Sequence, residues 1–144
     1  MRETFHRCSA FVCVAGTVLL ASCAGERREP VYAVGGKVLA DGKPAEGALV
    51  MFHQVGADQK TAVKPSGRTG PDGTFRMSSY TANDGAPEGE YAVTIVWPTR
   101  PPPNRPDAED GPDRLKGRLA DPKTSKWRVK VEKKPLELEP FKID

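Results

Sequence analysis

The stretch Gly89-Glu90-Tyr91-Ala92-Val93-Thr94-Ile95-Val96-Trp97 has the clearest strand pattern in the chain. Tyr91, Val93, Ile95 and Trp97 stand at every second position, so their side chains share one face of an extended backbone. The intervening positions hold smaller residues that suit the other face of a sheet. This stretch therefore predicts a long strand that contributes one face to the core.

Shorter stretches of the same kind lie on both sides of it. Residues 48–53 are almost continuously apolar, and residues 127–131 alternate apolar with charged side chains. Asp41-Gly42-Lys43-Pro44 and Gly70-Pro71-Asp72-Gly73 are strong turn signals, and we expect Pro44 to stop strand pairing. The best helical candidate, residues 113–119, is short. The chain therefore predicts an all-β fold, a single Ig-like sandwich of about seven strands over residues 32–144.

The alternation also predicts the core and one irregularity in it. Leu136 and Leu138 lie on the opposite parity from Phe141 and Ile143, so a bulge or kink near Pro140 must shift the register if all of them are buried. The expected core residues are Val38, Val50, Phe52, Phe75, Tyr91, Val93, Ile95, Val129, Val131 and Leu138.

Several blocks between residues 34 and 97 follow an order that is typical of one family. They are Gly36-Lys37-Val38, Asp41-Gly42-Lys43-Pro44, Gly47-Ala48-Leu49-Val50-Met51-Phe52, Gly67-Arg68-Thr69-Gly70-Pro71-Asp72-Gly73-Thr74-Phe75 and Gly89-Glu90-Tyr91-Ala92-Val93-Thr94-Ile95. Together they resemble carboxypeptidase regulatory-like domains, with Gly70 where that family often has Asp. The resemblance implies a transthyretin (prealbumin)-like sandwich that acts as a binding or structural module without catalytic residues.

The N-terminus has the layout of a secretory signal peptide. A basic head with Arg2 and Arg7 precedes an apolar stretch, residues 11–20, that is half as long as the ~20 residues of a membrane-spanning helix. Leu20-Ala21-Ser22-Cys23 then resembles a bacterial lipobox, although an ordinary secretory signal followed by a free cysteine is an alternative. We therefore expect a lipoprotein signal peptide over residues 1–22 and a lipidated N-terminus and linker over residues 23–31.

Cysteine usage agrees with this interpretation. The chain has three cysteines, and only Cys23 follows the expected cleavage point, so no disulfide framework is expected. Attachment of palmitate-type acyl chains at Cys23 would hold the protein on a bacterial membrane, facing the periplasm or the cell exterior, because more than one chain is needed for stable anchoring.

Charge and residue types limit the candidate functions. The net charge is +3, and basic and acidic residues are interspersed, unlike the clustered basic face of a nucleic-acid-binding protein. Residues 123–134 are the most basic part of the chain and could contact an anionic lipid or polymer. His53 is the only histidine after the signal, so neither a metal site nor a general base is indicated, and no cofactor is expected. The spaced acids Asp107, Glu109, Asp110 and Asp113 suit a solvated loop better than a calcium site.

Two features remain as candidate contact sites. Trp97 and Trp127 are candidate ligand contacts, because exposed aromatic side chains on a sandwich stack on sugars, although packing at the rim of the core explains them equally simply. The proline-rich loop over residues 98–112 is expected to be extended and free of strand pairing, and it is the first place to look for a partner.

The sequence thus predicts a non-enzymatic, lipid-anchored envelope protein with a binding or structural role toward a protein or glycan. The alternatives are a carbohydrate-binding module that uses Trp97 and Trp127, and a metal-dependent carrier or hydrolase that uses the acidic loop.

Overall fold

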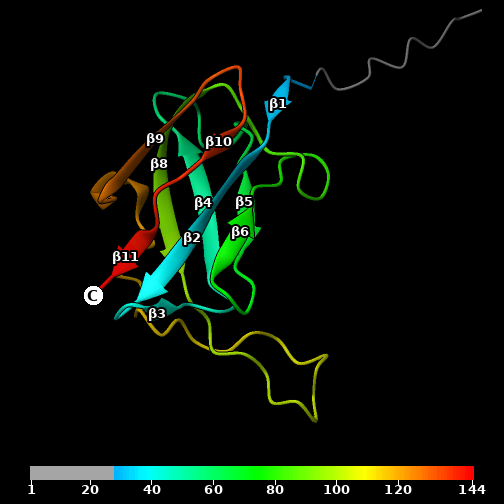
Figure 1. Cartoon of the computed structure of the whole chain (residues 1–144), viewed down its shortest axis with the longest axis vertical. Coiled ribbons are helices and arrows are strands. Elements are labelled where there is room, and N and C mark those ends of the chain that lie inside the picture. Colours follow the sequence, from blue (N-terminus) through cyan, green and yellow to red (C-terminus); the bar gives the residue numbers. More distant parts are fainter. Residues whose placement is uncertain (1–27) are drawn as a thin grey trace, which may run out of the picture.

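The computed structural model describes residues 28–144, so the predicted signal peptide and Cys23 lie outside the described residues (Figure 1). Short strands make up most of the regular structure. They are β1 (Val31–Tyr32), β2 (Val34–Ala40), β3 (Lys43–Pro44), β4 (Leu49–Gln54), β5 (Ser66–Arg68), β6 (Thr74–Arg76), β7 (Ala86–Pro87), β8 (Gly89–Val96), β9 (Trp127–Val131), β10 (Leu136–Glu137) and β11 (Phe141–Ile143). The one helical turn described is the 3-10 helix η1 (Pro122–Thr124). Within residues 28–144, no helix is long and apolar enough to cross a membrane.

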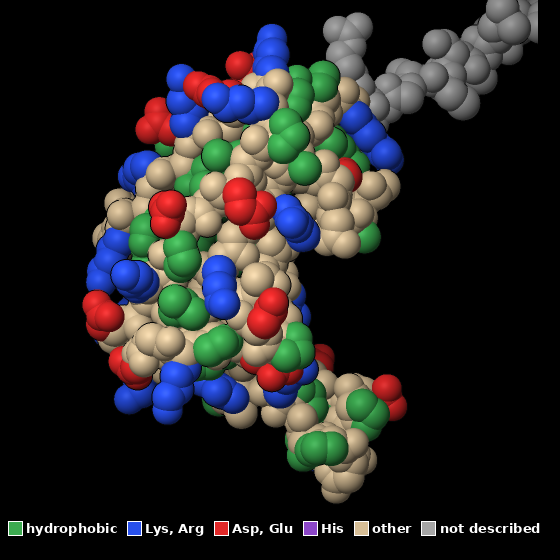
Figure 2. All heavy atoms as spheres, in the orientation of Figure 1, with side chains coloured by type: hydrophobic (Ala, Val, Ile, Leu, Met, Phe, Trp, Pro, Cys, Tyr) green, Lys and Arg blue, Asp and Glu red, His purple; other side chains and the backbone are tan. Residues whose placement is uncertain are grey.

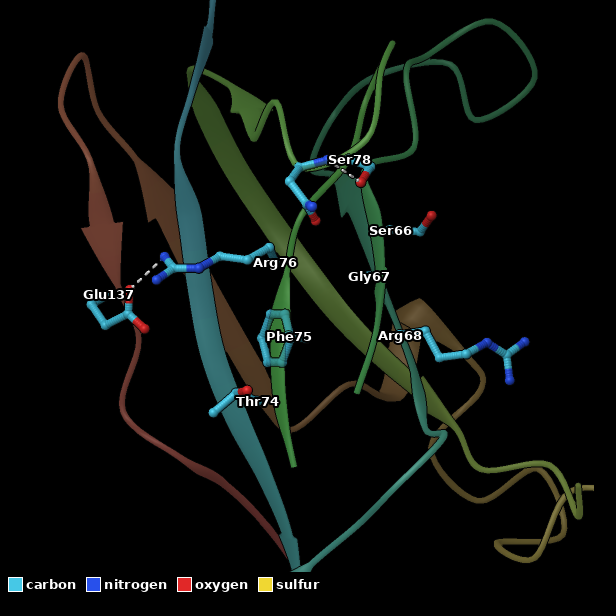
Figure 3. A pocket seen from close by; sticks show the side chains of 9 residues that line it. Ser66, Gly67, Arg68, Thr74, Phe75, Arg76, Ser78 and Glu137 are labelled. Atoms are coloured by element: carbon cyan, nitrogen blue, oxygen red, sulfur yellow. Dashed lines mark hydrogen bonds and ion pairs between the residues drawn. The ribbon is translucent and has the colours of Figure 1, made fainter. Parts of the chain in front are cut away.

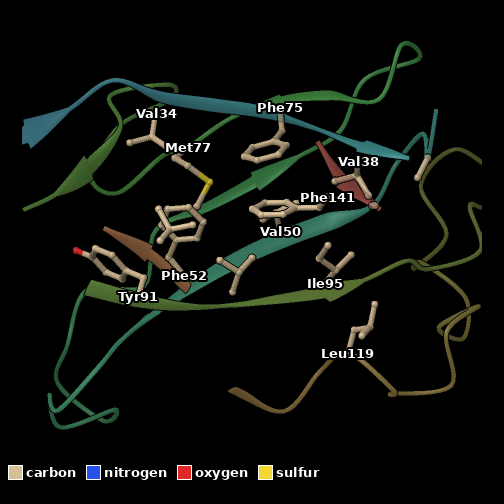
Figure 4. Packing of buried hydrophobic residues seen from close by; sticks show 14 of the residues in the cluster. Val34, Val38, Val50, Phe52, Phe75, Met77, Tyr91, Ile95, Leu119 and Phe141 are labelled. Carbon is tan, nitrogen blue, oxygen red and sulfur yellow. The ribbon is translucent and has the colours of Figure 1, made fainter. Parts of the chain in front are cut away.

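Two sheets face each other across the core, which confirms the predicted all-β sandwich (Figure 4). One is four-stranded, in the order β5-β4-β8-β9, and the long strand β8 is central in it. The other is five-stranded and centred on β2, which pairs with β3 and β6 antiparallel and with β10 and β11 parallel. A small separate pair, β1 and β7, lies near the start of β2.

Two adjacent glycines allow β2 to hold strands on both of its sides. A Cβ atom at Gly35 would stand 2.6 Å from Nη1 of Arg76, whose side chain crosses the outer face of the sheet. A Cβ atom at Gly36 would stand 2.9 Å from the ring of Phe75, on the inner face. At Gly36 the Phe75 ring is buried in the core and leaves little room for a side chain. At Gly35 the close atoms are the far end of the exposed Arg76 side chain, which can move aside.

The C-terminal strand follows β2 with one extra residue, as the parity of its apolar positions predicts. Leu136 pairs with Val34 and Phe141 pairs with Val38, so five steps along the C-terminal segment match four steps along β2. The additional residue falls in the unpaired stretch between β10 and β11, which includes Pro140. Because of this shift, Phe141 and Ile143 reach the core.

The buried residues agree closely with the alternation pattern (Figure 4). Every predicted core residue is buried except Leu138, which is half-buried and packs against the edge of the cluster. Leu138 was wrongly placed in the core because it lies in the unpaired segment where the register shifts. The ring of Phe52 packs on that of Tyr91 at 5.4 Å within one sheet, and Phe75 stacks on Phe141 at 6.1 Å within the other. Trp127 of β9 packs against Phe141 of β11 at 5.2 Å, and this contact joins the two sheets.

Two local predictions are wrong. Pro44 does not stop pairing, because Leu39 opposes it in the β2–β3 hairpin and a proline in that place needs no N–H bond of its own. Residues 66–68, for which the sequence pattern predicts no strand, form β5 along β4. Their sequence, Ser-Gly-Arg, lacks the apolar alternation by which the other strands are recognised.

The buried Thr69 follows β5 and bonds the segment that leads into β4. Its hydroxyl accepts a hydrogen bond from the Ala48 N–H at 2.8 Å and donates to the Ala45 carbonyl at 2.5 Å. Both backbone groups are buried with it, so one threonine satisfies polar groups that would otherwise cost free energy.

The fold makes stability depend on pH through Tyr91. Its phenol is buried and donates a hydrogen bond to the Pro87 carbonyl at 2.9 Å, and burial, helped by the charges of Glu29 and Tyr80, raises the pKa of Tyr91 from 10.0 to about 12. The unfolded chain therefore ionises at a lower pH than the folded chain. The free energy of unfolding should fall by about 2 to 3 kcal/mol as the pH rises from 10.0 to about 12. Urea unfolding at a series of alkaline pH values measures this loss.

The matched control is Tyr91→Phe, which removes the ionisable group and keeps the ring. This variant should lose about 1 kcal/mol at neutral pH, from the lost hydrogen bond, and its stability should change less than that of the native chain in alkali. If the free energy of unfolding fell equally with alkaline pH in both proteins, Tyr91 would not be the group responsible for the loss.

Candidate binding face

Two pockets on one side of the sandwich share the side chain of Arg68. The first, with a volume of about 460 Å³, lies over the edges of β5 and β6 (Figure 3). Hydroxyl and guanidinium groups line much of it: Ser66, Thr74 and Ser78 supply the hydroxyls, and Arg68 and Arg76 supply the guanidinium groups. The pocket is polar and offers mainly hydrogen-bond donors to a ligand.

The edges of β5 and β6 are joined at both ends of this pocket but not between them. Ser66 and Ser78 exchange two backbone hydrogen bonds, and the Gly70 N–H donates to the Thr74 carbonyl. The backbone of Arg68, midway between these links, points away from β4, because its neighbours Gly67 and Thr69 are the residues bonded to that strand. β5 pairs with β4 and β6 pairs with β2, and no ladder joins β5 to β6 at Arg68.

The two arginines of the pocket form ion pairs with acids on other elements. Arg68 Nη2 lies 2.8 Å from Asp110 Oδ2, and Arg76 Nη1 lies 3.0 Å from Glu137 Oε2, above Gly35. All four side chains are well exposed, so each pair contributes only about 0 to 1 kcal/mol to stability. Their effect is to orient the guanidinium groups.

The base of the 98–112 loop is paired like a short ladder. Pro98 and Asp113 form an antiparallel bridge, the Thr99 N–H donates to the Pro112 carbonyl at 3.0 Å, and the Gly111 N–H donates to the Thr99 carbonyl at 2.7 Å. The expectation of an unpaired loop was therefore wrong at its base, where the two arms continue as a narrow hairpin.

The tip of the loop is built from two β-turns rather than from an extended polyproline segment. The Arg105 N–H donates to the Pro102 carbonyl at 2.9 Å, and the Ala108 N–H donates to the Arg105 carbonyl at 3.1 Å. Each turn has proline second and Asn or Asp third, at Pro103-Asn104 and Pro106-Asp107. Proline presets the backbone angle of the second position, which explains why these turns form.

The second pocket, of about 370 Å³, lies under this loop. Four prolines of the loop line it together with Arg68, Arg100, Ala108 and Asp110. Arg100 also pairs with Glu46 at 3.1 Å, so the loop is linked by charge to the sandwich at both arms. In Figure 2 the molecule is hollowed on this side, and the loop projects below the hollow. We call the surface formed by the two pockets the concave face.

Asp113 holds the base of the loop in place. Its carboxylate accepts hydrogen bonds from the N–H groups of Trp97, Leu115 and Gly117 at 2.8 to 3.0 Å. Partial burial disfavours the charged form, but the three donors outweigh it and lower the pKa of Asp113. Asp113, the last residue of the predicted acidic cluster, thus has a structural role as a hydrogen-bond acceptor.

The other predicted polar sites are dispersed. Asp110 pairs with Arg68, and within residues 28–144 no three His, Cys, Asp or Glu side chains are grouped to hold a metal. His53 lies on β4 with Nε2 2.9 Å from the Thr94 hydroxyl. Burial lowers the pKa of His53, and the nearby Lys64 adds to this while a hydrogen bond with Gln59 opposes it.

Both tryptophans are half-buried at the rim of the core. The indole N–H of Trp97 donates to the Glu46 carbonyl at 2.8 Å, and the Arg114 guanidinium lies 4.8 Å from the ring centre. Trp127 packs at 5.2 Å against Phe141 and lines a third pocket with its remaining surface. A ligand-contact role for either residue stays a prediction.

Sequence reasoning missed Arg68 and Arg76 as site residues. Both lie in short strands, and their acidic partners are 42 and 61 residues away, at a spacing that no local pattern reveals.

Comparisons with known proteins add little. No protein-family profile matches the chain, and no curated protein matches it. Among solved structures it is similar to a DUF3823 family protein from Parabacteroides merdae, with 16% identity, a TM-score of 0.40, and coverage of 78% of this chain and 45% of that one. A DUF3823 family protein from Bacteroides ovatus gives 16% identity, a TM-score of 0.40, and coverage of 76% and 44%. The chain thus spans less than half the length of either protein.

The structure predicts that the loop tip can be removed without unfolding the sandwich. Replacing residues 101–110 by Asn-Gly should change the free energy of unfolding by less than about 1 kcal/mol, because the lost ion pair is exposed and the loop is shortened. Chemical denaturation measures this. Asp113→Ala should cost more, about 1 to 2 kcal/mol, since three N–H donors lose their acceptor. If the tip deletion were the more damaging change, the loop would be part of the core packing.

Proposed function

We propose that this protein is a non-enzymatic, lipid-anchored module of the bacterial envelope that binds a partner protein on the concave face. The observation that carries the proposal is the construction of the 98–112 loop. A paired base, two successive β-turns and ion pairs from both arms hold an exposed, proline-rich projection in one conformation.

Pre-ordering of this kind favours binding. A segment that is already ordered loses little conformational entropy when a partner docks on it. Proline adds to this effect because its backbone angle is fixed and its ring is an apolar contact surface. The adjacent hydroxyl and guanidinium donors of the β5–β6 pocket supply hydrogen bonds that would set the orientation of the partner.

The arrangement of the molecule suits a tethered protein. β1, the first described strand, lies at one end of the long axis, and the 98–112 loop projects at the other end (Figure 1). A lipid at Cys23 would therefore hold the β1 end near the membrane and present the loop outward. Cys23 itself rests on the resemblance of Leu20-Ala21-Ser22-Cys23 to a lipobox.

A non-catalytic role is consistent with the resemblance to carboxypeptidase regulatory-like modules and with the surroundings of His53. This histidine lies on β4, bonded to Thr94, and is not among the residues that line either pocket of the concave face. Of the loop acids that the metal-dependent alternative would need, Asp110 forms an ion pair with Arg68 and Asp113 accepts backbone hydrogen bonds.

The anchor is tested by Cys23→Ala. The native protein should be found in the membrane fraction with the mass of a lipidated chain that begins at Cys23, and the variant should be released or remain unprocessed, because the sulfur that carries the lipid is gone. Fractionation and intact mass measure both. A variant that stays in the membrane at the native mass would contradict the proposal.

The concave face is tested by site-specific photo-crosslinking in cells. A photoreactive residue at Pro103 should give one dominant protein adduct, and Arg68→Ala together with Arg100→Ala should reduce its yield. The control position is Val55, which is 50% exposed and lies beside Glu90 at the far end of β8 from the loop. The same adduct at both positions, or an adduct insensitive to the arginine changes, would show that the concave face is not the docking site.

A further inference from the structure

A third pocket, of about 220 Å³, lies outside the concave face. Segments 118–119, 126–127 and 142–144 form it where the start of β9 meets β11. In Figure 1, β11 is on the opposite side of the sandwich from β5 and β6. The pocket is smaller than the ~300 to 1,000 Å³ that is usual for a drug-sized ligand, so it suits a single ring or charged group.

Three positively charged side chains line this small pocket. They are Arg118, Lys126 and Lys142, and none of them takes part in an ion pair within the described part of the chain. Arg118 donates a hydrogen bond to a main-chain oxygen of Asp144 at 3.0 Å, which directs its guanidinium group toward this acidic residue. Lys126 and Lys142 are the cations that remain for a ligand, so the pocket favours an anionic one.

The apolar part of the pocket comes from Trp127, Leu119 and Ile143. Trp127 is held by its contact with Phe141, while Leu119 and Ile143 are themselves buried. A fixed indole beside convergent cations matches a ligand that has both an apolar C–H face and a negative charge. A carboxylate-bearing sugar has this combination, since its ring stacks on an aromatic face while its carboxylate accepts charge-assisted hydrogen bonds.

We propose that this pocket binds one uronic-acid residue of an acidic polysaccharide. Lys126 and Lys142 contact the carboxylate and Trp127 packs against the sugar ring. The site is separate from the concave face, so the protein would hold an acidic glycan on one side and its protein partner on the other.

The test is calorimetric titration of the full-length protein, purified in detergent, with a short oligouronate. Lys126→Ala with Lys142→Ala should weaken binding by about tenfold or more, because two charge-assisted contacts are lost. The matched control is Lys130→Ala with Lys133→Ala, which removes the same charge from residues paired with Glu132 and Glu88 outside the pocket. The control should bind nearly as well as the native chain.

Further binding measurements distinguish a specific sugar site from simple charge attraction. Trp127→Phe should weaken oligouronate binding, and a neutral oligosaccharide of the same length should not bind. Inorganic phosphate and vesicles of anionic phospholipid serve as competitors, and neither should displace the oligouronate. The proposal would be overturned if the oligouronate did not bind or if the vesicles displaced it. It would also be overturned if both lysine double variants lost the same affinity, or if Trp127→Phe folded and bound as well as the native chain. Because none of these variants touches the concave face, failure here leaves the protein-binding proposal to its own crosslinking test.

Discussion

The pairing of β2 on both of its sides is the constraint on which the rest of the structure depends. This one strand joins β3 and β6 to β10 and β11, so the first half of the domain and its last residues lie in the same sheet. The two missing side chains at Gly35 and Gly36 allow it. One leaves room for the Arg76–Glu137 ion pair that spans β2, and the other admits the Phe75 ring into the core. A side chain at Gly36 would press on the Phe75 ring, whereas one at Gly35 would displace the end of the Arg76 side chain and its ion pair.

The core follows from this arrangement and from the alternation on β8. Tyr91, Val93 and Ile95 could be placed on one face from the sequence, because the period of a strand leaves little choice once several large residues share a parity. The register shift before Phe141 could be predicted for the same reason. Leu138 could not be placed correctly, because parity gives no information about a residue in the segment that absorbs the shift. β5 escaped prediction because Ser-Gly-Arg has no pattern to read.

The candidate binding face could be predicted only in part. Proline content drew attention to residues 98–112, and the Pro-Asn and Pro-Asp pairs contain the turn signal that the polyproline expectation overlooked. The base of the loop and the role of Asp113 depend on contacts with Trp97, Leu115 and Gly117, which form only in the folded chain. The same holds for Arg68, whose acidic partner is distant in sequence, and for the third pocket, whose three segments converge only through β9 and β11. Long-range convergence of polar groups leaves no local trace in a sequence.

The parallel pairing of the chain's first long strand with its last strands has a mechanical consequence. A load applied between the start of β2 and the end of β11 would act along these strands, in the direction of shear. Hydrogen bonds in a sheared parallel pair share the load and break together, whereas those of a hairpin pulled from its open end break one after another. Under tension the rate of unfolding governs survival. The sandwich should therefore resist stretching between the start of β2 and the end of β11.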